Sequence, residues 1–422
     1  MKFAELNLPE EVLQGITKTG FTDLTPVQEE SIPLALAGHD VAAQAQTGTG
    51  KTAAFLISLF TKLLRSEAGK DGKGPRALIL APTRELVVQI VADAASLGAS
   101  CPFKVQAIFG GVDYEKQRTA LRDGVDVIVA TPGRLIDYMK QNVFSLKQVE
   151  SLVIDEADRM FDMGFIKDLR YILRKLPAVE DRQNMLFSAT LSPRVMELAY
   201  EFMNLVERVR IEPEQVTAER VQQVLYHASR REKFPLLLGL MKKEENAERV
   251  MIFVNTKREA EHLTDRLKVN EHKAAVISGD IPQNKRMRIL ADFKEGKLRF
   301  LVATDVASRG LHIDAVTHVI NYDLPQDAED YVHRIGRTAR AGALGKAISF
   351  ADEDLVFHLP DIEEYIGRKI PSVFPEEEDF CRDYKRGIPH KKTPPAPEKR
   401  GGTPGGGRPR RPRSGRGKPG AR

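Results

Sequence analysis

The stretch that decides the fold is Ala-Gln-Thr-Gly-Thr-Gly-Lys-Thr at residues 45–52, which follows a short apolar run and precedes a helix-like segment. A second stretch, Val-Ile-Asp-Glu-Ala-Asp at 153–158, also places acidic residues directly after an apolar run. Glycines let backbone N–H groups turn toward phosphate oxygens, and an acidic pair can hold magnesium and an attacking water. Together the two stretches predict a site that hydrolyses a nucleoside triphosphate.

Each residue type has a role that its chemistry allows. Lys51 is expected to reach the β- and γ-phosphates, and the hydroxyl of Thr52 to bind magnesium. Asp155 is expected to contact the metal, and Glu156 to position or deprotonate water. The first position of the general phosphate-loop pattern is Gly, but here it is Ala45. Taken alone, the two stretches could be a glycine-rich turn and a solvated acidic helix start; their combination favours a site.

The rest of the body repeats one rhythm, in which a short apolar run is followed by a helix-like segment. Such runs, short and rich in β-branched residues, predict parallel strands, which place ligands beyond their carboxyl ends. The runs are Val41–Ala45, Ala77–Ala81, Val125–Ala130, Leu152–Ile154, Met185–Phe187, Val250–Val254, Ala274–Ile277, Phe300–Ala303, Val316–Ile320 and Ala347–Phe350. The predicted fold class is α/β.

Bulk properties limit the alternatives. A chain of 422 residues predicts two or three domains, and 42% apolar residues suffice for ordinary cores. Cys101 and Cys381 form neither a metal spacing nor a disulfide framework, as expected for a reducing cytosol. The first residues contain no long apolar core, so we expect no signal peptide, and no apolar stretch is long enough for us to expect a membrane span. We therefore expect a cytoplasmic protein.

The charge is concentrated at one end of the chain. Residues 385–422 hold 13 Lys and Arg and one acidic residue, so the remaining 51 basic and 58 acidic residues give the body a net charge of −7. This segment also holds nine Gly, eight Pro and no aromatic residue, a composition that predicts disorder. The tail is expected to act as an electrostatic arm for a polyanion, or merely to aid solubility.

Four segments are predicted from these patterns. Residues 1–206 form a first domain and 221–374 a second. The polar stretch 207–220 between them, with Pro213 and no clear period, is expected to be a linker. Residues 375–422 are expected to form a disordered basic tail.

The motifs resemble those of the DEAD-box RNA helicases, and the resemblance covers about residues 3–370. Asp155-Glu156-Ala157-Asp158 spells the family name, and Gly20-Phe21 through Gln28 is similar to its adenine-reading motif. Further matches are Pro82–Leu86, Gly110-Gly111, Thr131–Arg134, Ser188–Thr190, Phe253–Thr256, Gln283–Arg286, Ala303–Asp305, Ser308–Gly310 and His333–Arg340. The resemblance implies two RecA-like domains that close on ATP and RNA.

It also implies roles for individual residues. Phe21 would stack on adenine, and the amide of Gln28 can pair with the donor and acceptor on its edge. The residues implied to bind ATP are Gln46, Thr47, Gly48, Thr49, Gly50, Lys51, Thr52 and Gly310, besides these two. Those implied to contact RNA are Arg84, Gly110, Gly111, Thr131, Arg134, Thr304 and Arg309. Those implied to couple hydrolysis to unwinding are Ser188, Thr190 and His333.

Two arginines carry a catalytic expectation. His333, Arg337 and Arg340 are spaced so that, on a helix, they share one face. In the family, the matching arginines reach the γ-phosphate, and an arginine finger supplies several powers of ten in rate. Without the surrounding motif, a solvated basic helix face would be the default interpretation. The hydroxyl and guanidinium groups of the RNA set suit sugar–phosphate contact, so little sequence preference is expected.

One departure points to a subgroup. His312 stands where the family usually has the aspartate that contacts the ATP ribose, so this contact is in question. The stretches 158–168, 310–319 and 359–367 are similar to a bacterial subgroup that works with the endoribonuclease RNase E through its second domain. The resemblance therefore implies RNA degradation and RNase E as a partner.

The leading hypothesis is an ATP-dependent enzyme that locally separates short RNA duplexes. The alternative is an RNA-binding scaffold or annealing factor in which the tail acts and ATP serves as a clamp. Glu156, Arg337 and Arg340 favour the enzyme. A DNA-directed motor is a third hypothesis, which RNA-against-DNA stimulation of ATP turnover would test.

Overall fold

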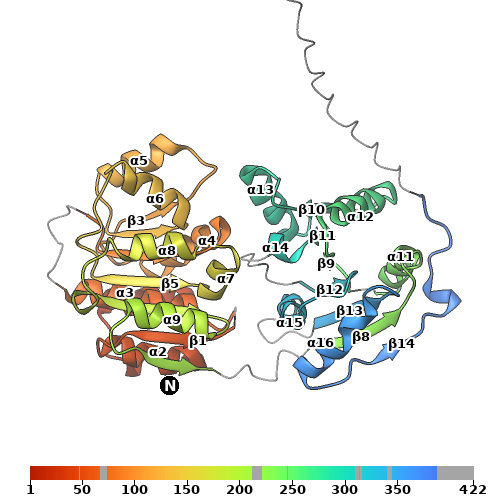
Figure 1. The fold of residues 1–422 in the computed structure, drawn as a ribbon, viewed down its shortest axis with the longest axis horizontal. Coiled ribbons are helices and arrows are strands. Elements are labelled where there is room, and N and C mark those ends of the chain that lie inside the picture. The colour runs from red at the N-terminus through yellow and green to blue at the C-terminus, as the bar shows by residue number, and fades with distance from the viewer. Residues whose placement is uncertain are drawn as a thin grey trace, which may run out of the picture. The chain divides into compact units, whose positions relative to one another are not determined.

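The computed structural model describes residues 1–46, 48–66, 74–211, 221–244, 246–308, 313, 316–339 and 345–386. These residues form two α/β domains, each with helices on both faces of a seven-stranded parallel sheet (Figure 1). The order is β3-β4-β2-β5-β6-β1-β7 in the first sheet and β10-β11-β9-β12-β13-β8-β14 in the second. The two orders correspond strand by strand. The α/β prediction is therefore confirmed.

The first domain contains strands β1–β7 and the helices that connect them. Its strands are β1 (Val41–Gln44), β2 (Ala77–Leu80), β3 (Val105–Ile108), β4 (Val127–Ala130), β5 (Ser151–Asp155), β6 (Gln183–Ser188) and β7 (Glu207–Arg210). Its helices are α1 (Glu10–Thr19), α2 (Pro26–Leu36), α3 (Lys51–Arg65), α4 (Arg84–Leu97), α5 (Tyr114–Arg122), α6 (Pro132–Lys140), α7 (Ala157–Asp162), α8 (Ile166–Leu173) and α9 (Pro193–Phe202). Short 3-10 turns lie at Phe3–Glu5 and Val179–Asp181.

The second domain repeats this plan. Its strands are β8 (Val221–His227), β9 (Val250–Phe253), β10 (Ala274–Ile277), β11 (Phe300–Ala303), β12 (His318–Asn321), β13 (Gly345–Ala351) and β14 (Ser372–Val373). Its helices are α11 (Lys233–Lys243), α12 (Lys257–Val269), α13 (Gln283–Lys294), α14 (Asp305–Ser308), α15 (Ala328–Ile335) and α16 (Leu359–Ile366). Short 3-10 turns η3 and η4 lie at Val356–His358 and Glu377–Asp379. None of the described helices is long and apolar enough to span a membrane.

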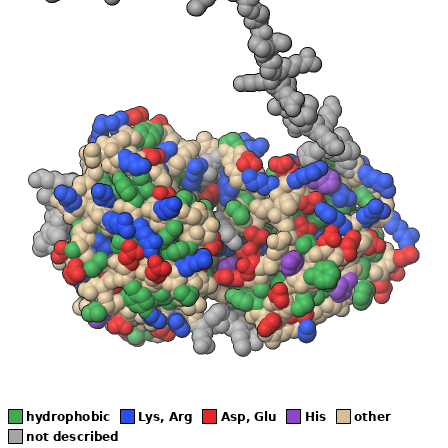
Figure 2. Space-filling view, in the orientation of Figure 1, with side chains coloured by type: hydrophobic (Ala, Val, Ile, Leu, Met, Phe, Trp, Pro, Cys, Tyr) green, Lys and Arg blue, Asp and Glu red, His purple; other side chains and the backbone are tan. Residues whose placement is uncertain are grey.

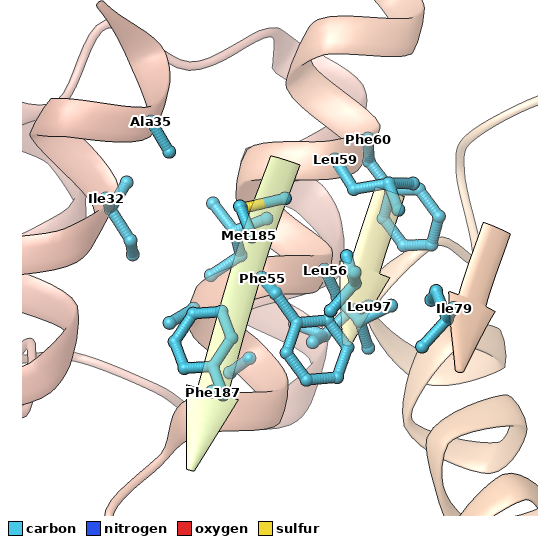
Figure 3. Packing of buried hydrophobic residues seen from close by; sticks show 14 of the residues in the cluster. Ile32, Ala35, Phe55, Leu56, Leu59, Phe60, Ile79, Leu97, Met185 and Phe187 are labelled. Atoms are coloured by element: carbon cyan, nitrogen blue, oxygen red, sulfur yellow. The ribbon is translucent and has the colours of Figure 1, made fainter. Parts of the chain in front are cut away.

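The core of the first domain explains why the phosphate loop is held firmly. Figure 3 shows Phe55 and Leu59 of α3 in one cluster with Met185 and Phe187 of β6, and all four side chains are buried. The rings of Phe55 and Phe187 lie 5.5 Å apart between centroids. Burying side chains of this size stabilises the domain by about 2 kcal/mol each. The helix that follows the loop is therefore fixed to the sheet.

All ten apolar runs overlap strands, but four strands were not predicted. Three of them, β3, β7 and β14, lie at sheet edges, where the side chains are only partly buried in β3 and mostly exposed in β7 and β14. The fourth, β8, alternates polar and apolar residues and lies between β13 and β14. Alternation of this kind carries a weaker signal than a fully buried run.

Two predicted boundaries are wrong. The linker was predicted to begin at residue 207, yet Glu207–Arg210 forms β7 and pairs in parallel with β1. Only Val209 of this strand is buried, so its sequence resembled a polar connection. Residues 212–220 of the predicted linker lie outside the described residues.

The tail was predicted to begin at residue 375, yet residues 375–386 pack on the second domain. We call this segment the strap. Its Cys381 is buried, and Phe380 and Tyr384 pack against the core beside α11. Lys243 of α11 donates to Asp379 at 2.7 Å. Residues 387–422 of the predicted tail lie outside the described residues.

The surface carries charges of both signs. On the face shown in Figure 2, Lys and Arg side chains are interspersed with Asp and Glu side chains on both domains. This distribution agrees with the near balance of basic and acidic residues in the body of the chain.

Candidate active site

The phosphate loop connects β1 to α3 and adopts a backbone that needs glycine. Gly48 and Gly50 have φ angles of 88° and 91°, which lie in the left-handed region. A Cβ atom on Gly50 would come within 2.5 Å of Nε2 of Gln28. Within the loop, the Thr49 hydroxyl donates to the Gln46 carbonyl at 2.7 Å. Both glycines are therefore favoured by the backbone conformation, and Gly50 also by the close approach of Gln28.

Lys51 is the first residue of α3 and the centre of a pocket of about 460 Å³. Its side chain is buried, and its Nζ has no hydrogen-bond partner in the described structure. Thr52, Asp155 and Glu156 line the same pocket. A buried ammonium group without a partner is costly, so its presence at a helix N-terminus fits a site for a phosphate group.

The acidic pair lies at the carboxyl end of β5. Burial, and to a lesser extent Glu156, raise the pKa of the Asp155 carboxyl to about 7, although Lys51 opposes the shift. Glu156 adopts φ 54°, in the left-handed region, and caps α7. Nη1 of Arg159 donates to both of its carboxylate oxygens, at 3.1 and 2.9 Å. The Glu156 carboxylate is therefore held in one position at the pocket wall.

The last acidic residue of this stretch connects two loops. Oδ2 of Asp158 accepts from the backbone N–H groups of Ala189 and Thr190, both at 3.0 Å. The Ser188 hydroxyl accepts from the Asp158 N–H at 3.1 Å. The loop after β5 is thus bonded directly to the loop after β6. A displacement of the acidic pair would therefore be transmitted through Asp158 to Ser188 and Thr190.

The other end of the pocket is suited to a planar base. Phe21 lines the pocket and is 44% exposed, and its ring is stacked with that of Phe3, with centroids 6.4 Å apart. The Gln28 side chain is buried; its Oε1 accepts from the Thr25 N–H at 2.9 Å, and its Nε2 donates to the Gly50 carbonyl at 3.1 Å. Gln28 therefore connects the base end of the pocket to the phosphate loop.

Arg84 and Arg134, two of the residues predicted to contact RNA, both lie close to Gly110 in the first domain. A Cβ atom on Gly110 would lie 3.2 Å from Nη2 of Arg84 and 3.8 Å from Nη2 of Arg134. Nη1 of Arg134 is buried without a hydrogen-bond partner in the described structure. Its guanidinium lies 5.0 Å from the ring centroid of Tyr114 and 5.8 Å from that of Tyr138. The arrangement leaves donors available to an anionic ligand.

Thr131 and Gly111 complete this surface. Thr131 is the N-cap of α6, and its N–H donates to the Ile108 carbonyl at 3.0 Å. Gly111 has a φ of 84°, which glycine adopts without strain. Both residues follow strands of the first sheet, at the edge where the carboxyl ends of the strands meet.

In the second domain, Arg334 connects three of the matching motifs. It is buried and forms a bidentate pair with Asp305, with both distances at 2.6 Å. It also donates to Oδ1 of Asn255 at 3.0 Å and to the Asp323 carbonyl at 2.6 Å. Asp305 follows Thr304, a buried member of the predicted RNA set. This network holds the loops after β9, β11 and β12 together.

The prediction that His333 and Arg337 share a helix face is wrong. α15 ends at Ile335, and Gly336 is its C-cap. Arg337 lies in the following turn, where its Nε donates to the His333 carbonyl at 3.3 Å. Glycine after the last helical residue is a common helix stop, which the periodicity argument ignored.

The structure does not place every predicted site residue. Thr47, Arg309, Gly310, His312 and Arg340 lie outside the described residues. The roles predicted for them stay predictions.

Sequence reasoning missed Arg159, Arg334 and Tyr114 as members of the site. Arg159 and Arg334 each follow a predicted site residue closely along the chain, and each compensates a carboxylate that a motif supplies. The positions of Arg159 and Arg334 beside motif residues could therefore have indicated that both belong to the site. Tyr114 contacts Arg134 from another helix, and the sequence gives no sign of that contact.

Comparison with known proteins identifies the family. Residues 25–198 match the DEAD/DEAH box helicase model, and residues 232–342 match the helicase conserved C-terminal domain. The chain is 53% identical to the ATP-dependent RNA helicase RhlB of Idiomarina loihiensis, over 92% of this chain and 91% of that protein. It is 56% identical to RhlB of Xanthomonas axonopodis pv. citri, over 87% of this chain and 65% of that protein.

Solved structures agree with this assignment. Dbp5 of S. cerevisiae, solved with RNA and ADP BeF3, matches with a TM-score of 0.78 and 33% identity, over 88% of this chain and 95% of that one. The chain belongs to the DEAD-box family of ATP-dependent RNA helicases, and its two domains are of the RecA-like type.

Proposed function

We propose that this protein is an RNA-dependent ATPase that binds ATP with Mg²⁺ in the pocket around Lys51 and uses its hydrolysis to separate short RNA duplexes. The observation that carries the proposal is the buried Nζ of Lys51, which has no partner in the described structure and shares a pocket with Asp155 and Glu156. The ammonium group of Lys51 and the carboxylates of Asp155 and Glu156 together suit a triphosphate with a bound cation better than an uncharged ligand.

The residues present fit such a ligand. Lys51 and the N–H groups at the start of α3 would hold the phosphates, while Asp155 and the Thr52 hydroxyl would hold Mg²⁺, which prefers oxygen ligands. The metal would neutralise charge on the phosphate oxygens. Glu156, fixed by Arg159, would orient a water and accept its proton. Phe21 and Gln28 would hold the adenine.

The described RNA residues would bind the sugar–phosphate backbone. Arg84 and Arg134 offer charged donors beside Gly110, and backbone contacts of this type carry no base sequence. The Asp158 bonds to the loop after β6 give a physical route from the acidic pair to Ser188 and Thr190. In the second domain, Arg337 would supply an arginine finger, and Arg334 would hold its loop close to Thr304.

The biological setting follows from the relatives. The similarity to proteins named RhlB supports a role in bacterial RNA degradation in the cytoplasm, with RNase E as a partner of the second domain. The test is co-purification of the second domain with RNase E from the same organism.

ATP turnover tests the proposed activity directly. It should be measured without nucleic acid, with single-stranded RNA and with DNA of the same sequence. RNA alone is expected to stimulate turnover, and Glu156→Gln to abolish it while RNA binding remains. Equal stimulation by DNA would contradict the assignment of RNA. Stimulation that survives Glu156→Gln would contradict the role of Glu156.

The alternative, an ATP-clamped scaffold, makes a different prediction. If the basic tail performs the function, Glu156→Gln protein should still support RNA processing in cells. The fixed geometry of Glu156 and Arg159 favours the enzyme, because a clamp would not need a carboxylate held for water.

A further inference from the structure

A second pocket, of about 760 Å³, lies in the second domain and has no role in the function proposed above. It opens among the loops that follow β8, β9, β12 and β13, at the carboxyl ends of these strands. Four arginines line it: Arg230 and Arg231 after β8, Arg266 on α12, and Arg386 at the end of the strap. We call this pocket the arginine groove.

Two of the four acidic residues that line the groove, Asp323 and Asp352, share one buried lysine as their partner. Lys233, which is 1% exposed, forms ion pairs with Asp323 at 3.0 Å and with Asp352 at 2.5 Å. The Glu259 carboxylate lies 3.9 Å from Nδ1 of His262. The contacts with Lys233 compensate Asp323 and Asp352 inside the domain, whereas the side chain of Glu259 stays 30% exposed.

The arginines are less engaged. Arg231, Arg266 and Arg386 carry no ion pair among the residues that the structure describes. Arg230 approaches Asp354 only to 3.8 Å, with both side chains about 70% exposed, where an ion pair contributes little. The Arg266 guanidinium lies 3.7 Å from the ring centroid of Phe234, which fixes its position. Unpaired guanidinium groups around a concave surface favour an anion.

Position in the fold favours RNA as that anion. Asn255 and Thr256, which follow β9, line the groove, and β9 pairs with β11, which precedes Thr304. The groove is therefore continuous with the sheet edge that carries the RNA residues of this domain. Beyond Arg386, residues 387–422 add 11 Lys and Arg and one acidic residue.

We propose that the arginine groove binds the sugar–phosphate backbone of the RNA where it extends past the core contacts. The proposal rests on the proposed function, because it takes Thr304 and its neighbours as the core RNA site. Arginine forks bind phosphate without reading bases, so the groove adds affinity for longer strands without adding sequence preference. The strap completes the groove by supplying Arg386.

The test uses the full chain with the double substitution Arg231→Gln and Arg386→Gln. Both side chains are exposed, so folding should be unaffected. The control pair is Lys268→Gln and Lys273→Gln, which makes the same change of charge at exposed positions near the amino end of β10, outside the groove. Affinity for oligouridylates of about 10 and about 30 nucleotides is measured against salt concentration, with a non-hydrolysable ATP analogue.

The groove variant is expected to bind the longer strand about tenfold more weakly at about 0.1 M salt, and its salt slope to fall by about 1.4, or about 0.7 for each phosphate that is no longer neutralised. Binding of the shorter strand and the ATP turnover that it stimulates should stay within about twofold of the unmodified chain. The control pair should resemble the unmodified chain with both strands.

Three outcomes would overturn the proposal. The first is an unchanged affinity and salt slope for the longer strand, which would leave the groove to an acidic protein segment. The second is equal weakening with both strands, which would place the arginines in the core RNA site. The third is an equal effect of the control pair, which would mean that general charge alone matters. Failure of the short strand to stimulate the unmodified chain would instead contradict the proposed function.

Discussion

The two domains have the same strand order, and each places a buried lysine at the start of the helix that follows the first strand of the domain along the chain. Lys51 begins α3 after β1, and Lys233 begins α11 after β8. The two lysines differ in their partners. Nζ of Lys51 has none in the described structure, whereas Lys233 pairs with Asp323 and Asp352.

The difference shows how one architecture supports a ligand site in one domain and a structural contact in the other. A buried charge must be compensated, either by groups of the protein or by a ligand. In the second domain, two carboxylates supply the negative charge. In the first, Asp155 compensates Lys51 only in part, because burial keeps the pKa of that carboxyl raised. We infer that the triphosphate completes the compensation there.

The largest effect is expected from Lys51→Met. ATP turnover should fall about 100- to 1,000-fold, as when one charge-stabilising donor is removed from an active site. Because Nζ of Lys51 has no hydrogen-bond partner in the described structure, the free energy of unfolding without nucleotide should change by less than about 1 kcal/mol. Steady-state kinetics and urea unfolding measure the two quantities. A large loss of stability would show that Lys51 has a structural role.

Lys233→Met should do the reverse. It leaves two carboxylates without their cation, one of them nearly fully buried, which is expected to cost about 3–5 kcal/mol of unfolding free energy. Turnover per folded molecule should remain near that of the unmodified chain. Lys257→Met is the matched control, because its pair with Asp280 is exposed on both sides and should contribute at most about 1 kcal/mol. Equal effects of the two substitutions would contradict the account.

The substitution Asp155→Asn should change the free energy of unfolding by an amount that depends on pH. The Asp155 pKa is raised from 3.8 to about 7 by burial, so the unmodified protein binds a proton here more tightly when folded than when unfolded. The contribution of Asp155 to the free energy of unfolding therefore decreases as the pH rises from 3.8 to about 7. Asparagine does not titrate, so the variant lacks this dependence on pH. The stability of Asp155→Asn relative to the unmodified chain should increase by about 2 kcal/mol between about pH 5 and pH 7. Urea unfolding of both proteins at several pH values measures it, and a constant difference would contradict the raised pKa.

The smallest effect concerns the strap. Tyr384 packs edge-on against Phe234 of α11, with ring centroids 5.6 Å apart. Tyr384→Ala should lower the free energy of unfolding by about 1 kcal/mol, the range measured for aromatic pairs. Tyr365, which is 56% exposed, provides the control, since Tyr365→Ala removes no comparable described contact. No difference between the two would mean that the strap does not stabilise the second domain.

Much of the fold could be predicted, because buried parallel strands appear in a sequence as short apolar runs. Edge strands such as β7 and β14 could not be predicted, since their stability comes from hydrogen bonds to a neighbour and not from their own apolar residues. The strap was missed because the disordered tail was predicted to begin at residue 375, although the basic segment without aromatic residues begins only at residue 385, after Phe380, Cys381 and Tyr384.

The residues of the candidate site could be predicted where they belong to short motifs that follow the strands of one sheet. Asp155 and Glu156 lie at and directly after the end of β5, and Lys51 begins the helix that follows β1 of the same sheet, so their convergence follows from the topology of parallel sheets. Contacts between side chains on separate elements of the second domain are a different matter. The pairing of Arg334 with Asp305 joins residues on separate elements, and no spacing in the chain indicates it.

The most direct test of the central claim is the number of ATP molecules bound per chain, measured by titration calorimetry with a non-hydrolysable analogue and Mg²⁺. The account predicts one site in the unmodified protein and none in Lys51→Met, because the lysine of the second domain is already compensated. Two sites per chain, or one site that survives Lys51→Met, would contradict it.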